Sequence, residues 1–254
     1  YRVFAGVRKP EDGERLLNQG GARIVPVTID VTDYDSINKA KAFIENETSG
    51  TLHALVNNAG VAYCGAAETL PMRQVQQLFD VNVLGVFAIT QAFLPMLRQA
   101  CGRIVNMGSI SGLFAVPGLS AYSASKHALE GFSDAIRVEL APFGISVSII
   151  EPGKIDTPIW EKELNVQAQK SSSNANAVEL IYEPLNIFYQ NYASTEKATP
   201  INRVVSALEH ALDSPAPKPR YVIGSPAKLR TLLNRIPTRW RDRLVLKNVP
   251  ITRP

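Results

Sequence analysis

Short apolar runs alternate with longer helical stretches along this chain, and this alternation constrains its fold more than any other feature. Each apolar run has the length of a buried strand, and each intervening stretch has the length of a helix. We expect strands over residues 2–7, 23–29, 52–57, 103–107, 145–150 and 221–224. We expect helices beginning near Pro10, capped by Asp33, over 71–98 and over 121–140. Strands that alternate with helices predict an α/β fold, a doubly wound parallel sheet with helices on both faces.

Length and composition agree with a single domain over residues 1–254. A chain of 254 residues fits one large α/β domain, and a hydrophobic content of 45% is enough for a substantial core. The two cysteines and three histidines are scattered, so we expect neither a disulfide framework nor a metal site. The net charge of +4 gives no argument for nucleic acid, and no such partner is expected. Nothing resembles a signal peptide, so we expect a cytoplasmic protein.

Tyr122 and Lys126 stand four residues apart in the helix expected over 121–140, and Ser109 lies upstream of them. At this spacing two helical side chains share a face, so the Lys126 ammonium can lie beside the Tyr122 hydroxyl. A phenol has a pKa of about 10, and a nearby ammonium favours the phenolate and lowers that pKa. Ser109 follows the strand expected over 103–107, so its hydroxyl should point into the crevice at the carboxyl end of the sheet. These side chains predict a proton-transfer site.

Three further motifs stand in order around this pair. They are Asn57-Asn58-Ala59-Gly60, Asp80-Val81-Asn82-Val83 and Glu151-Pro152-Gly153-Lys154. With the Tyr-x-x-x-Lys pair, this ordered set resembles the short-chain dehydrogenase/reductase family over residues 1 to about 224. The resemblance implies a Rossmann-like fold, an NAD(P) cofactor and an oxidoreductase that acts on CH–OH groups. It favours catalysis over the plainer interpretation of the pair, a tyrosine packed on the stem of a lysine.

The resemblance implies a catalytic set of four residues. Tyr122 would exchange the proton with the substrate, Ser109 would donate a hydrogen bond to the substrate oxygen, and Lys126 would lower the pKa of the tyrosine. The backbone of Asn82 would hold a water molecule in the proton relay. The alternative for Asn82 is structural, because an asparagine inside a helix can simply bond locally or mark a kink.

The same resemblance implies which residues contact the cofactor. Lys126 would bind the nicotinamide ribose beside Tyr122. The other contacts would be made by Asp30 and Val31 at the adenine, by Asn58, Ala59 and Gly60 beneath the adenosine ribose, and by Pro152, Gly153 and Thr157 at the nicotinamide. The loop that begins at Pro152 also fits an ordinary strand exit, which a Pro-Gly pair favours in any case.

The choice between NAD and NADP should depend on the end of the family's second strand, which here reads Gly6-Val7-Arg8-Lys9. A carboxylate at this place binds the ribose hydroxyls of NAD, whereas an arginine accommodates the extra phosphate of NADP. A guanidinium forms a planar fork that suits phosphate. Arg8 therefore predicts NADP, with NAD as the alternative if the basic pair is only a solvated turn.

A dinucleotide-binding domain begins with a strand and a Gly-rich turn that leads into a helix N-terminus at the pyrophosphate. The early glycines are Gly6, Gly13, Gly20 and Gly21, and none follows a first strand with this spacing. The chain starts at what resembles the family's second strand. We therefore expect the first strand and the Gly-rich loop to be missing through truncation. The alternative is a protein that lost the loop and binds no dinucleotide.

Apolar residues predict the substrate class. Residues 158–199, where the family builds the substrate lid, and the loop over 112–119 are both rich in them. We expect a bulky hydrophobic alcohol or ketone, steroid- or retinoid-like, as in the branch of retinol, hydroxysteroid and hydroxybutyrate dehydrogenases. An amphipathic helix packed on the core explains the lid nearly as well. The alternatives are an NAD-dependent dehydrogenase of a small hydroxy acid or acyl substrate, and a catalytically silent binding module.

Two surfaces suggest partners. The helices expected over 71–98 and 121–142 are the family's usual contact in oligomers, which implies a homodimer or homotetramer. The tail over 218–254 holds ten Lys or Arg and one acidic residue, so its net charge is +9. Its apolar residues recur at helical spacing around Trp240, a pattern that fits peripheral contact with an anionic membrane through the extension over 225–254. The alternative is a helix that closes over the substrate pocket.

Overall fold

The computed structural model shows an α/β fold and describes residues 1–156, 178, 180–185, 187, 189, 198–224, 233, 236–247 and 249. Its strands are β1 Val3–Val7, β2 Ile24–Thr28, β3 Ala54–Asn57, β4 Arg103–Met107, β5 Ser146–Pro152 and β6 Arg220–Ile223. Its helices are α1 Pro10–Gly20, α2 Tyr34–Thr48, α3 Met72–Phe79, α4 Gly85–Gln99, α5 Ser120–Leu140, α8 Asn202–Asp213 and α10 Thr238–Leu246. Short helical turns are η1 Gly21–Arg23, η2 Asp80–Leu84, η3 Ile110–Gly112 and η4 Ala141–Phe143. The expected strands and helices are all present, with bounds that differ by only a few residues.

Asp33 shows why one helix begins where the sequence predicted. Its side chain accepts hydrogen bonds from the backbone N–H groups of Asp35 and Ser36, at 2.9 and 3.3 Å. These two groups have no partner inside the first turn of α2, so the carboxylate satisfies them and fixes the first residue of the helix.

Among the described residues every strand pairing is parallel, and these pairings form two separate sheets. One holds β1 and β2, and the other runs β3-β4-β5-β6. In the doubly wound strand order, the first strand lies between the second and the fourth. By the resemblance, β1 corresponds to the second strand and β3 to the fourth, so the break falls where a first strand would lie. The apolar residues of β1 and β3 are half-buried or exposed, whereas those of β4 and β5 are buried except for Met107 and Pro152 at the strand ends.

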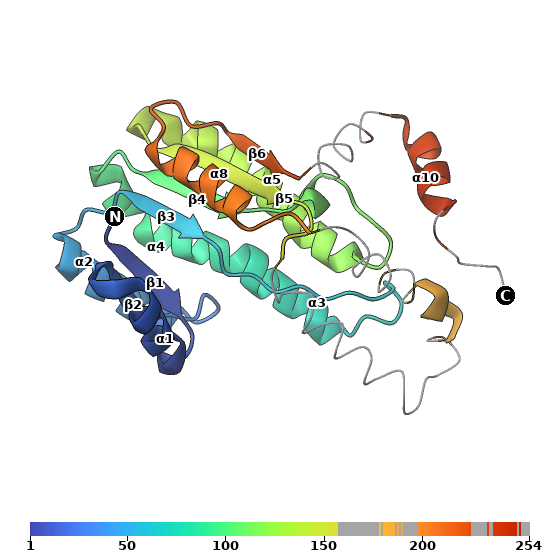
Figure 1. Ribbon diagram of the computed structural model, residues 1–254, viewed down its shortest axis with the longest axis horizontal. Helices are drawn as coiled ribbons and strands as arrows, with labels where there is room; N and C mark the ends of the chain where they lie inside the picture. Colours follow the sequence, from blue (N-terminus) through green and yellow to red (C-terminus); the bar gives the residue numbers. More distant parts are fainter. Residues whose placement is uncertain are drawn as a thin grey trace.

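Side chains on the larger sheet alternate between two helical layers. Ile104 of β4 packs in a cluster with residues of α4 and α5, whereas the next residue, Val105, packs with residues of α8. This is the alternation that the strand pleat imposes. In Figure 1, α8 accordingly lies on one side of β4 and β5, and α4 and α5 lie on the other. The prediction of helices on both faces is therefore confirmed.

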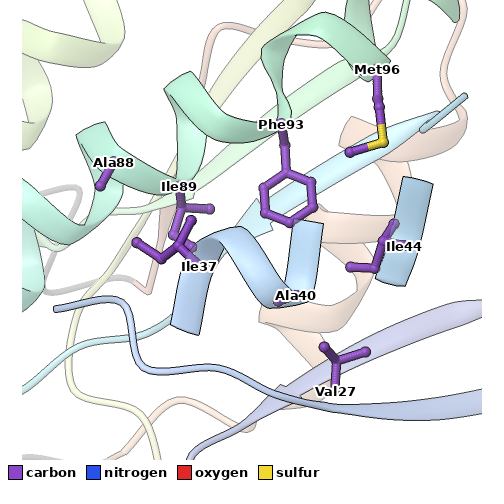
Figure 2. Close-up of a cluster of buried hydrophobic side chains, with 8 residues drawn as sticks. All are labelled: Val27, Ile37, Ala40, Ile44, Ala88, Ile89, Phe93 and Met96. Carbon is purple, nitrogen blue, oxygen red and sulfur yellow. The ribbon is translucent and has the colours of Figure 1, made fainter. Parts of the chain in front are cut away.

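A separate apolar cluster joins α2 to α4. Phe93 and Met96 of α4 meet Ile37 and Ile44 of α2, and all four side chains are at most 7% exposed. Figure 2 shows these residues converging between the two helices, with Val27 of β2 below them. The cluster connects the small sheet to the rest of the domain despite the break between β1 and β3.

One helical stretch within the described residues, Met72–Gln99, is long and apolar enough to cross a membrane by length and composition. It consists of α3, η2 and α4, which run on as one helix, and 56% of its most apolar window is buried inside the protein. Its contacts with the sheet and with α2 account for this composition.

We predict that Ile104→Ala lowers the free energy of unfolding by about 2–5 kcal/mol, because Ile104 is fully buried and its loss leaves a cavity. Met72→Ala is the matched control, since Met72 is 75% exposed, and it should change stability by less than about 0.5 kcal/mol. Urea unfolding measures both. Equal effects of the two substitutions would contradict this assignment of the core.

Candidate active site

The first half of α5 lies along the exit of β4. Lys126 donates a hydrogen bond through Nζ to the backbone oxygen of Met107, the last residue of β4, at 2.8 Å. The same Nζ lies 5.9 Å from the centre of the Tyr122 ring, and both side chains belong to buried residues. The helical spacing of the pair therefore brings the two groups together, as the sequence predicted.

Ser109 completes this group from the loop that leaves β4. It is 8% exposed, and its Oγ accepts a hydrogen bond from the backbone N–H of Ser111 at 3.1 Å, which starts the short helix η3. Burial raises the pKa of the Tyr122 phenol, and a hydrogen bond with Ser109 opposes that rise. The structure thus joins Ser109, Tyr122 and Lys126 in one buried site.

The sequence predicted that Lys126 lowers the pKa of the Tyr122 phenol, and the structure does not show this lowering. The pKa of Tyr122 is raised, because its complete burial disfavours the phenolate. Burial also lowers the pKa of Lys126 to about 8, although the charge of Glu130 opposes this change. The sequence could not show this, because spacing along a helix reports neighbours and not the degree of desolvation.

Asn82 lies in η2, a wide π-type turn between α3 and α4. Its side chain is 1% exposed and forms two bonds with the backbone of Val61, both 2.9 Å long: Nδ2 donates to the oxygen and Oδ1 accepts from the N–H. Nδ2 also donates to Ser125 Oγ of α5 at 3.2 Å. The side chain thus connects the loop after β3 to the helix that carries Tyr122, through bonds to residues far away in the sequence and not through the local bonds that the structural alternative expected. Single-turn π-helices of this kind often occur at functional sites.

The expected cofactor contacts lie at the carboxyl ends of successive strands. Asn58, Ala59 and Gly60 follow β3 and are exposed, and a Cβ at Gly60 would lie 3.4 Å from Asn82 Oδ1. Such small residues let a ligand approach the backbone closely. Val31 packs against Gly85 at the start of α4. A Cβ built on Gly85 would lie only 2.8 Å from Cγ2 of Val31. The turn over 58–60 is thus open to solvent, whereas Val31 is half-buried against the core.

Arg8 and Asp30 follow the paired strands β1 and β2, so they lie at the same edge. The Asp30 carboxylate accepts hydrogen bonds from the backbone and hydroxyl of Thr32, at 2.9 and 2.7 Å. These bonds lower the pKa of Asp30, and the charge of Arg8 lowers it further. Arg8 is exposed, so its guanidinium can reach an anionic ligand at this edge.

The remaining cofactor residues follow β5. Pro152 ends that strand, and the Gly153 N–H donates to the backbone oxygen of Ile223 in β6 at 2.9 Å. Thr157 lies outside the described residues, and so does most of the lid over 158–199. Arg8, Asp30, the turn over 58–60 and Gly153 thus each follow a parallel strand at its carboxyl end, which is where open α/β sheets bind ligands.

Two residues of the expected lid are buried within the described part of the chain, and one of them packs at the site. Tyr189 is 5% exposed and packs in one apolar cluster with Tyr122, together with Ala62, Cys64, Leu78 and Leu119. Leu185 is 3% exposed and packs with Ala66 and Val249. The Tyr122 side chain therefore packs among apolar residues, while its hydroxyl bonds with Ser109.

Sequence reasoning missed three charged residues beneath the site: Glu130, Glu151 and Arg220. They form one buried ion cluster although they come from α5, β5 and β6. Glu151 stands within a recognised motif, but nothing in that motif shows that its carboxylate meets an arginine 69 residues later.

The comparisons with known proteins agree with this geometry. The family model described as short chain dehydrogenase matches residues 1–168. Retinol dehydrogenase 5 of Mus musculus is 34% identical over 90% of this chain and 74% of its own length. The 17-beta-hydroxysteroid dehydrogenase type 6 of Bos taurus is 34% identical over 98% of this chain and 81% of its own length. The uncharacterized oxidoreductase YusZ of Bacillus subtilis is 43% identical over 65% of this chain, a match that spans 60% of that protein.

Solved structures give the same result. A short-chain dehydrogenase from Streptomyces avermitilis has a TM-score of 0.77 and 28% identity, with 96% of this chain and 84% of that chain covered. A short chain dehydrogenase from Burkholderia cenocepacia in complex with NADP has a TM-score of 0.71 and 26% identity, over 96% of this chain and 86% of that chain.

The fold and the site therefore define a Rossmann-like oxidoreductase. The chain belongs to the short-chain dehydrogenase/reductase family, in the branch of retinol and 17-beta-hydroxysteroid dehydrogenases. It is an NAD(P)-dependent oxidoreductase that acts on CH–OH groups.

Proposed function

We propose that this protein interconverts a bulky hydrophobic alcohol and its carbonyl compound with NADP, and that Tyr122 carries the proton. The observation that carries this proposal is the buried group of Tyr122, Ser109 and Lys126 at the carboxyl end of β4. A bound nicotinamide would supply or accept the hydride. The three side chains would handle the proton and the charge on the substrate oxygen.

In the reducing direction, Tyr122 donates its phenolic proton to the carbonyl oxygen, and Ser109 donates a hydrogen bond to the same oxygen. The Lys126 ammonium stabilises the phenolate left behind. In the oxidising direction the phenolate removes the proton from the alcohol. Asn82 positions this group by tying α5 to the loop after β3. Its backbone would hold the water through which the proton is replaced.

A hydrophobic substrate is supported by the apolar cluster around Tyr122, which includes Leu119 and Tyr189. The names of two relatives, a retinol dehydrogenase and a 17-beta-hydroxysteroid dehydrogenase, point to the same class. A steroid- or retinoid-like alcohol or ketone is therefore the substrate class that we propose.

We predict that Tyr122→Phe lowers kcat/KM by more than about 100-fold, because it removes the hydroxyl that transfers the proton and leaves the ring to pack. Cofactor affinity and thermal stability should change little. Tyr34→Phe is the control, since Tyr34 is 71% exposed at the start of α2. Steady-state assays with steroid and retinoid substrates measure the change, and activity near the wild-type value in Tyr122→Phe would rule out this mechanism.

NADP is supported by Arg8 at the end of β1 and by the structural relative that was solved with NADP. We predict that Arg8→Asp lowers the ratio of kcat/KM with NADP to kcat/KM with NAD by about 10-fold or more, because the new carboxylate repels the phosphate. The control is Arg15→Asp on α1, where the side chain of Arg15 is 77% exposed and pairs with Asp12 one turn away. An unchanged ratio in Arg8→Asp would show that Arg8 is a solvated turn residue.

We also propose that the whole protein has a further parallel strand between β1 and β3, followed by the Gly-rich turn. The break in the sheet and the half-exposed apolar residues of the two strands beside it support this proposal. Such a strand would pair with both neighbours and would place the pyrophosphate between Arg8 and the turn over 58–60.

A homodimer or homotetramer through α4 and α5 is a further part of the proposal. Leu84 and Phe87 are 57% and 39% exposed along this stretch, and the Phe87 ring lies 3.9 Å from that of Phe132 on α5. The two helices thus offer a shared apolar surface that a second copy of the chain could cover.

Helix α10 supports peripheral membrane contact. Its half-buried face points inward: Arg241 lies 5.8 Å from the Phe114 ring, and Val245 packs in the cluster that contains Leu185. Trp240 and Leu244, four residues apart, are 65% and 46% exposed on the outer face. Three exposed cations flank them, also at intervals of four residues: Arg239, Arg243 and Lys247. This outer face has the composition of an interfacial helix, and its inner face reaches the loop that follows Ser109.

We predict that the protein floats with anionic vesicles, and that the double substitution Trp240→Ala and Leu244→Ala abolishes this binding without lowering kcat for a water-soluble substrate. The reason is that the tryptophan inserts at the headgroups while the cations attract anionic lipid. Neutral vesicles and the variant Tyr34→Ala, which changes an exposed ring elsewhere, are the controls. Equal recovery in the unbound fraction with both lipids would contradict membrane contact.

A further inference from the structure

One arginine holds three carboxylates beneath the proton-transfer site. Arg220, the first residue of β6, pairs with Glu130 and also reaches Glu151 Oε1 at 2.5 Å and Asp134 Oδ2 at 2.6 Å. The side chain of Glu151 is 0% exposed and that of Glu130 is 9% exposed, whereas that of Asp134 is 47% exposed. Two buried carboxyl groups therefore share a single guanidinium.

Glu130 also contacts the loop that carries Ser109. Its Oε1 lies 2.9 Å from where a Cβ of Gly112 would be and 3.2 Å from where a Cβ of Gly108 would be. Gly108 precedes Ser109 and Gly112 ends η3, so a side chain at Gly112 would overlap the carboxyl group and one at Gly108 would press against it. The turn of α5 at Glu130 thus packs against the same loop whose start is held by Lys126 through Met107.

The charges around Glu130 come from every element that packs against it. Lys126 and Asp134 lie on α5, Glu151 on β5 and Arg220 on β6. Asp134 is also paired with Arg137 at 3.1 Å and is partly solvated, so its charge is balanced there. Glu130 and Glu151 therefore share Arg220 as their ion-pair partner. Lys126, which is buried, is the other cation near Glu130.

The protonation states of Glu130 and Lys126 depend on each other. Burial and the charge of Glu151 raise the pKa of Glu130 to about 8, although Arg220 opposes both effects. Burial lowers the pKa of Lys126 to about 8, and Glu130 opposes that effect. An ionised Glu130 therefore keeps Lys126 protonated to higher pH.

We propose that Glu130 is a positioning residue of this enzyme: it supplies the buried counter-charge for Lys126 and packs the Ser109 loop through Gly108 and Gly112. This inference rests on the proposed roles of Tyr122 and Lys126. It extends the site to the Glu130–Arg220–Glu151 cluster, which has no contact with the substrate and acts through the lysine.

The test is the pH profile of kcat/KM for carbonyl reduction with the full chain and its cofactor. Glu130→Gln keeps the size of the side chain and its ability to accept a hydrogen bond from Arg220, but it removes the charge. Lys126 then loses its proton at lower pH. The fall of kcat/KM on the alkaline side of the profile, its alkaline limb, should therefore shift to lower pH by roughly half to one pH unit. Asp134→Asn is the matched control, because it removes a carboxylate from the same arginine at a half-exposed position, and its limb should not move.

A second variant gives a shift of the opposite sign. Glu151→Gln removes the like charge beside Glu130, so Glu130 ionises more readily and the alkaline limb should move to higher pH. This variant also serves if Glu130→Gln does not fold, as judged by thermal unfolding. The inference is overturned by an unmoved limb in either folded variant, or by an equal shift in Asp134→Asn.

Tyr122→Phe separates this inference from the proposed function. If Tyr122→Phe is inactive and the limb of Glu130→Gln does not move, the proton-transfer mechanism stands and only the role of Glu130 is wrong. If Tyr122→Phe is active, the proposed mechanism fails, and the inference about Glu130 fails with it.

Discussion

A buried chain of polar side chains fixes α5 against the sheet, and the candidate active site depends on it. Asn57 of β3 donates to Asn106 of β4 at 2.8 Å, and Asn106 donates to Ser133 of α5 at 2.9 Å. Asn106 is 0% exposed, so leaving its amide without partners would be costly. Only one rotation of α5 about its axis satisfies this chain. That rotation turns the face with Tyr122 and Lys126 toward the exit of β4.

The same face of α5 combines stability with chemistry. At successive turns it meets the loop that carries Ser109, the end of β4 and the ion cluster around Arg220. Burial holds the side chains of this face in place, but it also raises the pKa of Tyr122 and lowers that of Lys126. The Tyr122 phenolate and the Lys126 ammonium are therefore both disfavoured. The proposed counter-charge at Glu130 offsets part of this cost where the lysine must remain a cation. In this interpretation the ion cluster is part of the acid–base machinery, although it lies outside the pocket.

Helix α10 and the lid suggest how substrate access is organised. Residues from both parts meet in one small apolar cluster, in which Leu185 and Val249 are buried together. The inner face of α10 lies at Phe114, in the loop after Ser109, and its outer face presents Trp240. A lipophilic alcohol could then pass from a membrane surface to the pocket without crossing much water. This arrangement connects the proposed substrate class to the proposed membrane contact.

The sequence by itself determined the α/β class and the parallel strands, because strand and helix periods are local properties, and the helical spacing placed Tyr122 beside Lys126. The proposed catalytic set came from the resemblance of its ordered motifs to the family. The sequence also located the cap at Asp33, whose bonds reach only two and three residues ahead. Only the tertiary structure decided the break between β1 and β3, the pKa directions of Tyr122 and Lys126, and the meeting of Glu130 with Arg220. These depend on desolvation and on contacts between residues up to 90 positions apart, such as Glu130 with Arg220. Such contacts leave no periodic signal in the chain, since they exist only once the strands and helices have packed.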